Sequence, residues 1–167
     1  MALTADIIRT WRAPRAVIRD LLDQGRREDR AVAFVMIACF LIFVAQWPRL
    51  SRIANGYEPS PWPPEINFEG MMTYTFYAVV IMLPLALYGM AAVAHLIAKA
   101  FRGQGSWYSA RLSFFWALLT TTPLLLLHGL VRGFIGPGTQ SILVGTVWAL
   151  AFAYIWIQCM IATERGQ

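Results

Sequence analysis

The two histidines of this chain are its best candidates for chemistry, because both lie inside long apolar stretches. Ionisable groups within membrane spans mark ion or proton pathways, and a pair of histidines can hold a haem iron. If the stretches are helices, His95 lies close to one end of its helix and His128 lies far along the next helix. At 1.5 Å per residue the two depths differ by roughly 20 Å, which excludes one iron shared by both side chains.

A cation follows each histidine four residues later: Lys99 follows His95, and Arg132 follows His128. Residues with this spacing are neighbours on one face of a helix. We therefore expect neutral histidines near the membrane interface, each bonded to a backbone carbonyl or to water. A functional role for either histidine is the alternative.

Three hydroxyl side chains, Thr120, Thr121 and Thr122, directly precede Pro123. Proline lacks an N–H group, so it leaves a helix carbonyl without its usual donor, and nearby hydroxyls can satisfy that carbonyl. The alternative is a polar notch for a substrate. The sequence contains no His/Cys/Asp/Glu cluster with metal spacing, no G-x-S-x-G motif and no H-E-x-x-H motif. We predict no catalytic residues, no metal site and no cofactor.

The elements that carry these residues must be membrane helices. Of the 167 residues, 58% are hydrophobic and 14% are charged, whereas a soluble domain has about 45–50% and about 25%. Spans need about 20 apolar residues, and four stretches qualify: 31–48, 71–98, 112–131 and 142–162. The predicted fold is an all-α integral membrane protein, with a four-helix transmembrane bundle preceded by an N-terminal amphipathic helix.

Two prolines are expected to bend these spans. The second stretch, 71–98, would be about 42 Å long as one helix, beyond a hydrocarbon core of about 30 Å. It is still too short for two spans, so we expect one tilted helix that bends near Pro84. In the third stretch, Pro123 is the predicted kink.

The arginines predict the orientation of the chain. If the N-terminus is cytoplasmic, eleven of the Lys and Arg residues lie inside and three lie outside, as the positive-inside rule requires. The predicted domains are a cytoplasmic segment 1–30, a membrane domain 31–162 and a cytoplasmic tail 163–167, in a bacterial inner membrane. The basic residues that give the chain its formal charge of +5 lie mainly next to the membrane, so we exclude a nucleic-acid partner.

The polar stretch "FRGQGSWYSARL", residues 101–112, is then a tight cytoplasmic turn. Its glycines permit the reversal, and its aromatic residues rest at the lipid headgroups. A lone G-x-G is weak evidence for phosphate binding. The turn residues are Gly103, Gly105, Ser106, Trp107 and Tyr108.

The N-terminal segment has apolar residues at intervals of three or four with arginines beside them, which predicts an amphipathic helix. Such a basic helix either lies on the inner leaflet or docks against the span bundle. The residues assigned to the membrane surface are Trp11, Arg12, Arg15, Ile18 and Leu22.

A stripe of small residues in the last span predicts helix packing. Ser141, Gly145, Ala149 and Ala153 recur every four residues and would let another helix approach closely. We favour the chain's own bundle over a dimer as the contact. The aromatic residues Trp148, Phe152 and Trp156 lie on another face, which meets lipid or a partner.

Three segments in order resemble the bacterial branch of the Yip family of multispanning membrane proteins. These are "PRAVIRDLLDQGRREDR", then "FRGQGSWYSARL" after a span with a proline, then "TTTPLLLL" in the next span. The resemblance implies a non-catalytic protein of membrane organisation or of a membrane complex. The five spans and the acidic-aromatic motif of eukaryotic members are missing, so binding to Rab proteins is not carried over.

These observations favour a non-enzymatic inner-membrane protein that acts as an accessory or scaffold component. Its expected partners are the lipid bilayer and one or more membrane proteins, with a homo-oligomer as a further possibility. The alternative function is a small-solute transporter or channel subunit, which the bent spans favour. A membrane enzyme ranks third.

Overall fold

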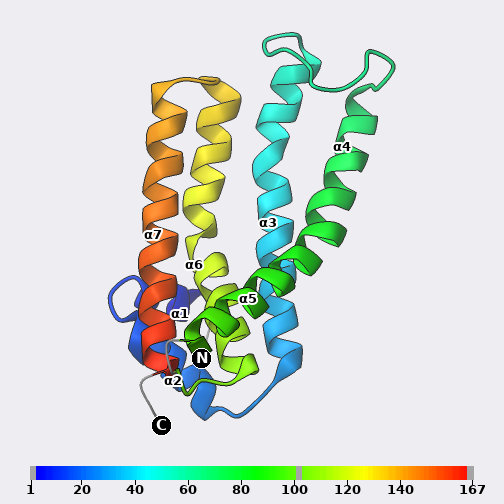
Figure 1. The fold of residues 1–167 in the computed structure, drawn as a ribbon. Helices are drawn as coiled ribbons and strands as arrows, with labels where there is room; N and C mark the ends of the chain where they lie inside the picture. Colours follow the sequence, from blue (N-terminus) through cyan, green and yellow to red (C-terminus); the bar gives the residue numbers. More distant parts are fainter. Residues whose placement is uncertain (1–2, 101–102, 165–167) are drawn as a thin grey trace.

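The computed structural model describes residues 3–100 and 103–164, and the described residues form helices without any strand (Figure 1). Two short helices come first, and long apolar helices follow. The elements are α1 (Leu3–Thr10), α2 (Pro14–Asp23), α3 (Glu28–Ala54), α4 (Phe68–Phe76), the π-helix η1 (Tyr77–Met82), α5 (Leu83–Ala100), α6 (Trp107–Phe134) and α7 (Thr139–Glu164).

Four helices are long and apolar enough to cross a membrane: Glu28–Ala54, Phe68–Ala100, Trp107–Phe134 and Thr139–Thr163. The all-α fold with four spans, preceded by a short helix, is therefore confirmed. Each helix extends beyond the span predicted for it, because polar residues at its ends continue the helical backbone. In α3, for example, the acidic residues of the first turn interact favourably with the helix dipole.

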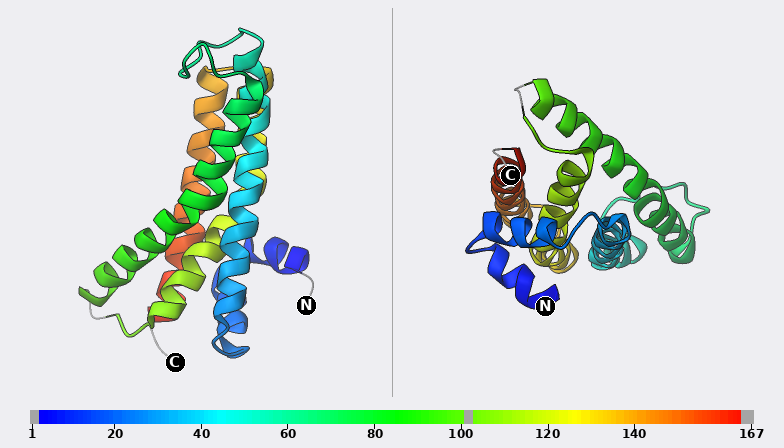
Figure 2. Two further views of the ribbon diagram at one scale, coloured as in Figure 1. Left: turned by 90° about the vertical axis from the view of Figure 1, so that its right-hand side faces the viewer. Right: turned by 90° about the horizontal axis from the view of Figure 1, so that it is seen from below.

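The second span is one continuous helix whose middle segment is π-helical. The π-helical segment Tyr77–Met82 ends two residues before Pro84, and the helix changes direction in this region (Figure 2). Proline cannot donate the i→i−4 bond and its ring collides with the preceding turn, which disturbs the regular ladder. As a result, α5 swings away from α3, whereas α4 runs beside it.

Helix α6 is the centre of the bundle. Helices α3, α5 and α7 all pack on it, and every residue of α6 from Tyr108 to Thr122 except Arg111 is buried. The approach of α3 to α6 is very close at two glycines. A Cβ atom on Gly129 would collide with the carbonyl group of Ala45, and one on Gly133 would collide with Pro48.

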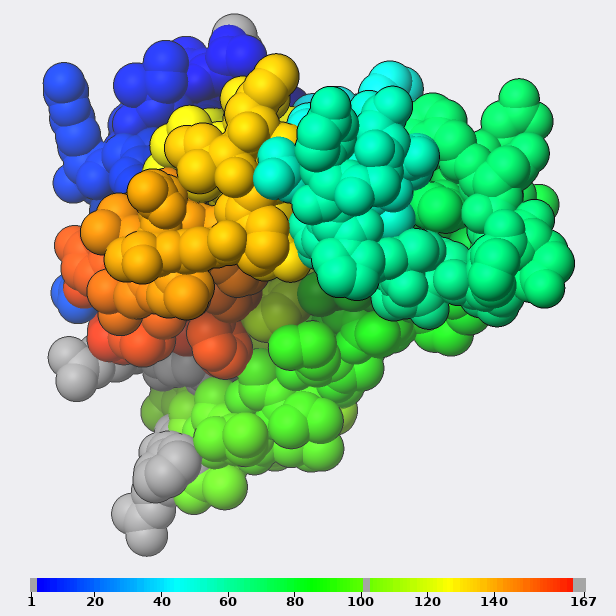
Figure 3. All heavy atoms as spheres, turned by 90° about the horizontal axis from the view of Figure 1, so that it is seen from above, coloured from blue at the N-terminus to red at the C-terminus, as the bar shows by residue number. Residues whose placement is uncertain are grey.

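We name the two ends of the bundle by what they carry. The loop end carries the α3–α4 loop, residues 55–67, and the α6–α7 turn (Figure 3). There, Trp62 and Ile66 of the loop pack against a small cluster of Leu50, Ile53 and Met71. The terminal end carries α1 and α2, which pack against α6 and α7.

Candidate functional site

The N-terminal helices dock on the protein rather than lying wholly on lipid. In α2, Val17, Ile18 and Leu21 are buried in the main core, and Leu22 packs against that core. The prediction that Ile18 and Leu22 face the membrane is therefore wrong. The apolar face of α2 is covered by α7, which is the docking alternative.

Polar contacts fix this docking. The indole Nε1 of Trp116 donates to the hydroxyl of Thr10 at 3.0 Å, and both side chains are fully buried. Arg15 Nε donates to Gln158 Oε1 at 2.6 Å, so this predicted surface residue binds α7. A salt bridge of 2.7 Å between Arg9 and Asp20 ties α1 to α2.

The residues assigned to the turn do not all lie in a turn. Ser106 is the N-cap of α6 and forms a capping box with Ser109, so Trp107 and Tyr108 belong to the first turn of the helix. The capping box satisfies free N–H groups at the helix start and fixes where α6 begins. Among the described glycines, those with positive φ are Gly25, Gly56 and Gly136, so Gly105 needs no left-handed conformation. Residues 101–102 lie outside the described residues.

Tyr108 is buried and does not rest at the lipid headgroups, which corrects that prediction. Its hydroxyl donates to the carbonyl of Arg27 at 3.3 Å and accepts from Arg30 at 3.3 Å. Arg30 also donates to the carbonyl of Leu21. The tyrosine thereby joins the start of α6 to the α2–α3 connection.

The two histidines lie at opposite ends of the bundle. His95 is buried near the terminal end, with its ring 4.4 Å from that of Trp107, and its Nδ1 has no hydrogen-bond partner among the described residues. The expected bond to a carbonyl is therefore not present at that atom. His128 lies in a cavity between α3 and α6 at the loop end. Among the described residues, no three His, Cys, Asp or Glu side chains form a group that could hold a metal ion.

The hydroxyls before Pro123 behave partly as expected. Thr122 Oγ1 donates to the carbonyl of Leu119 at 2.7 Å, which is the carbonyl that Pro123 leaves without a donor, so the prediction is confirmed for Thr122. Thr121 Oγ1 donates to carbonyls one turn back at 2.9 and 3.0 Å. Thr120 Oγ1 is buried without a partner among the described residues, so the prediction is wrong for Thr120.

The packing face of α7 differs from the predicted stripe. Ser141 is buried and Gly145 faces His128, but Ala149 is exposed, and Trp148, Phe152 and Trp156 pack against the core instead of lipid. The residues of α7 that pack against the rest of the protein are spaced alternately four and three residues apart, as in coiled coils. This face consists of Ser141, Gly145, Trp148, Phe152, Ile155, Cys159 and Ala162.

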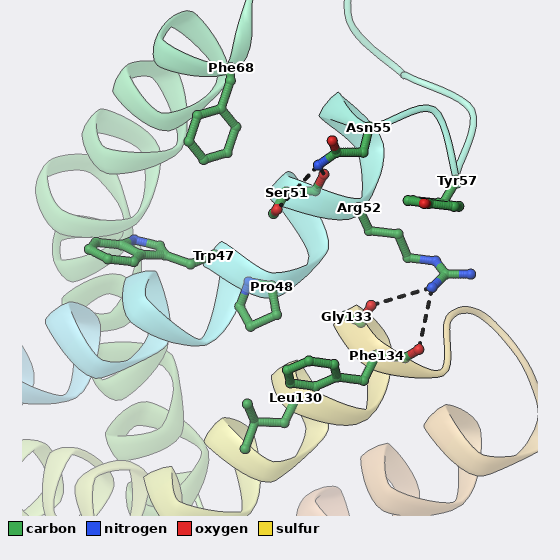
Figure 4. A pocket seen from close by; sticks show the side chains of 10 residues that line it. All are labelled: Trp47, Pro48, Ser51, Arg52, Asn55, Tyr57, Phe68, Leu130, Gly133 and Phe134. Carbon is green, nitrogen blue, oxygen red and sulfur yellow. Dashed lines mark hydrogen bonds between the residues drawn. The ribbon is translucent and has the colours of Figure 1, made fainter.

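A groove opens at the loop end between α3, α6 and the start of α4 (Figure 4). Its volume is about 680 Å³, and its walls include Trp47, Phe68 and Phe134. Arg52 lies along its edge and donates to the carbonyls of Gly133 and Phe134 at 3.4 and 3.5 Å. The groove is therefore mainly apolar, with one guanidinium group at its rim.

An ionic cluster that the sequence patterns do not predict lies on the side of the α3–α6 contact opposite the groove. The carboxylate of Glu58 binds Arg49 of α3 at 3.4 Å and Arg132 of α6 at 3.0 Å. The arginine distribution predicts the orientation, and Arg132 also follows His128 by four residues, but neither pattern indicates an ion pair. Both arginines follow directly on an apolar stretch. That position was the available signal, but the sequence does not show that Glu58, from the loop, reaches both.

Comparison with protein families gives one finding that covers nearly the whole molecule. The family model described as Yip1 domain matches residues 8–166. No curated protein and no solved structure matches the chain. The match includes α2, all four membrane-spanning helices and the ionic cluster.

Proposed function

This chain belongs to the Yip1 domain family, and on that premise we propose that it is a non-enzymatic accessory or scaffold component of a membrane complex. The family and the four apolar helices make it a multi-pass membrane protein. The observation that carries the proposal is the position of α5, which packs on α6 but diverges from α3 (Figure 2), so that apolar side chains such as Val93 and Leu96 on its outer side are exposed.

The outward face of α5 contains both small and large apolar residues. We call Ala86, Gly89, Val93 and Leu96 the open face of α5; all four are exposed. A Cβ atom on Gly89 would have no neighbour within 4 Å. In membranes, small residues next to larger apolar ones let a second helix come close enough to gain van der Waals contact. The open face therefore fits an apolar transmembrane helix of another membrane protein.

The first helix supports a second contact, with the membrane surface. Helix α1 runs across the direction of the spans (Figure 2); Ile8 on this helix and Trp11 directly after it are 67% and 42% exposed. Arg12 lies next to Trp11 and is also exposed. An apolar surface with tryptophan and arginine suits the interface of an anionic leaflet. We propose that Trp11 and Arg12 touch lipid, while α2 holds the helix on the bundle.

Photocrosslinking in intact membranes tests the role of α5. With a photoreactive amino acid at Val93, we expect a crosslink to one membrane protein, whose mass identifies it as another protein or as a second copy of this chain. Gly89→Leu should abolish the crosslink, because the new side chain fills the open face without touching the protein's own core. The control position is Leu150, which is 67% exposed on α7. Crosslinks that Gly89→Leu leaves unchanged would refute the proposal.

A further inference from the structure

The cavity that contains His128 lies between α3 and α6 near the loop end and has a volume of about 310 Å³. Its polar walls are Gln46 and Arg49 on α3, and His128 and Arg132 on α6. These four side chains carry guanidinium, imidazole and amide groups, all able to donate hydrogen bonds. Apolar residues such as Ile42 and Leu125 close the cavity on the membrane side.

Among the described residues, the carboxylate of Glu58 is the one that binds Arg49 and Arg132. A single oxygen, Oε1, accepts from both Arg49 and Arg132. Its other oxygen, Oε2, is buried and has no partner among the described residues, and the same is true of Arg132 Nε. The side chain of Glu58 is 8% exposed. Two guanidinium groups therefore share one oxygen atom, and donor capacity is left over inside the cavity.

This arrangement fits an anion with more acceptor atoms than a carboxylate. A phosphate group presents several charged oxygens and can bind two guanidinium groups at once, each through paired N–H bonds. We propose that the cavity binds a phosphate group between Arg49 and Arg132, and that Glu58 is an internal competitor for the same guanidinium groups. Both arginines lie just beyond an apolar stretch, at the level where lipid headgroups are expected.

The phosphate has two sources, a phospholipid headgroup or a free phosphate ester, and both have the same chemistry. A cavity of this volume accommodates a phosphate with a small substituent. The seam between α3 and α6 below it is tightly closed, because Gly129 packs directly on the Ala45 carbonyl. A lipid would therefore place its headgroup in the cavity and its chains along the outside of the helices.

Binding measurements on the full-length protein in detergent separate the possibilities. Inorganic phosphate is titrated by calorimetry, and retention of phosphatidylglycerol is measured by native mass spectrometry, with diacylglycerol as the phosphate-free control. The variants are Arg132→Gln, Glu58→Gln and, as a matched loss of one charge at the same end, Arg52→Gln. Circular dichroism shows whether each variant is folded.

We expect opposite effects from the two cavity variants. Arg132→Gln should weaken phosphate binding at least tenfold, Glu58→Gln should strengthen it because the competitor loses its charge, and Arg52→Gln should leave it unchanged. Binding of inorganic phosphate would indicate a free ester, whereas selective retention of phosphatidylglycerol over diacylglycerol would indicate a headgroup. A purely structural ion pair would instead give no phosphate binding in the wild type and none in Glu58→Gln, and that result would overturn the proposal.

Discussion

Trp116 Nε1 and Thr10 Oγ1 are 3.0 Å apart, and this hydrogen bond joins α1 to the first half of the central helix α6. Both side chains are fully buried. The same hydroxyl donates to the carbonyl of Asp6 at 2.7 Å. A threonine at the end of the amphipathic helix α1 thus accepts the hydrogen bond of a core tryptophan's indole N–H.

Thr10→Val should lower the free energy of unfolding by about 1–3 kcal/mol, because it leaves the indole N–H buried without an acceptor. Unfolding in mixed detergent micelles measures the loss. Trp116→Phe and the double variant complete a double-mutant cycle. Effects that simply add in the double variant would show that the two side chains do not interact.

Gly129→Ala should separate α3 from α6, because the added methyl group would collide with the Ala45 carbonyl. Overpacking of this kind costs about 1–3 kcal/mol or more. Gly89→Ala is the matched control, since nothing lies near its Cβ position, and it should gain up to about 1 kcal/mol from helix propensity. Thermal unfolding of both variants in one detergent compares them. Equal effects would contradict the close helix contact.

Two isosteric threonine variants in α6 should have opposite outcomes. Thr122→Val removes the donor to the Leu119 carbonyl and should destabilise the protein by about 1 kcal/mol. Thr120→Val removes a buried hydroxyl without a described partner and should be neutral or stabilising. Denaturant titrations give both values. A larger loss for Thr120→Val would indicate a partner for this hydroxyl.

Two substitutions in α7 distinguish the observed packing face from the predicted stripe of small residues. Ile155→Ala should destabilise by about 2–5 kcal/mol, because Ile155 is buried in the core. Ala149→Leu should change stability by less than about 0.5 kcal/mol, because Ala149 is exposed. Unfolding in micelles measures both. The reverse order would restore the stripe as the contact.

The orientation of the chain stays a prediction from the arginine distribution. A bacterial alkaline phosphatase fused at Gln167 should be inactive, because both termini are expected in the cytoplasm. The same enzyme inserted near Pro61 should be active. Activity assays in whole cells, normalised to the amount of fusion protein, check this. Activity at Gln167 with none near Pro61 would invert the topology.

The class of the protein and its four membrane helices can be predicted from the amino-acid sequence. Apolar runs such as 112–131 are long enough to span a bilayer, and lipid requires their backbone groups to bond within the same segment. This constraint is local, so composition and length were sufficient. Thr122 beside Pro123 was predictable for the same reason, because donor and acceptor lie within one turn.

Tertiary structure alone decided which faces meet. Ala149 and Trp148 are adjacent, and both lipid and protein accept either side chain, so hydropathy does not show which one packs inside. The sequence also left open whether α2 lies on lipid or on the protein. The burial of Ile18 in the core shows that α2 packs on the protein. The contact of Glu58 with both Arg49 and Arg132 depends on the path of a loop and on the distance between two helices. Such contacts join residues far apart in the chain, so local sequence patterns do not predict them.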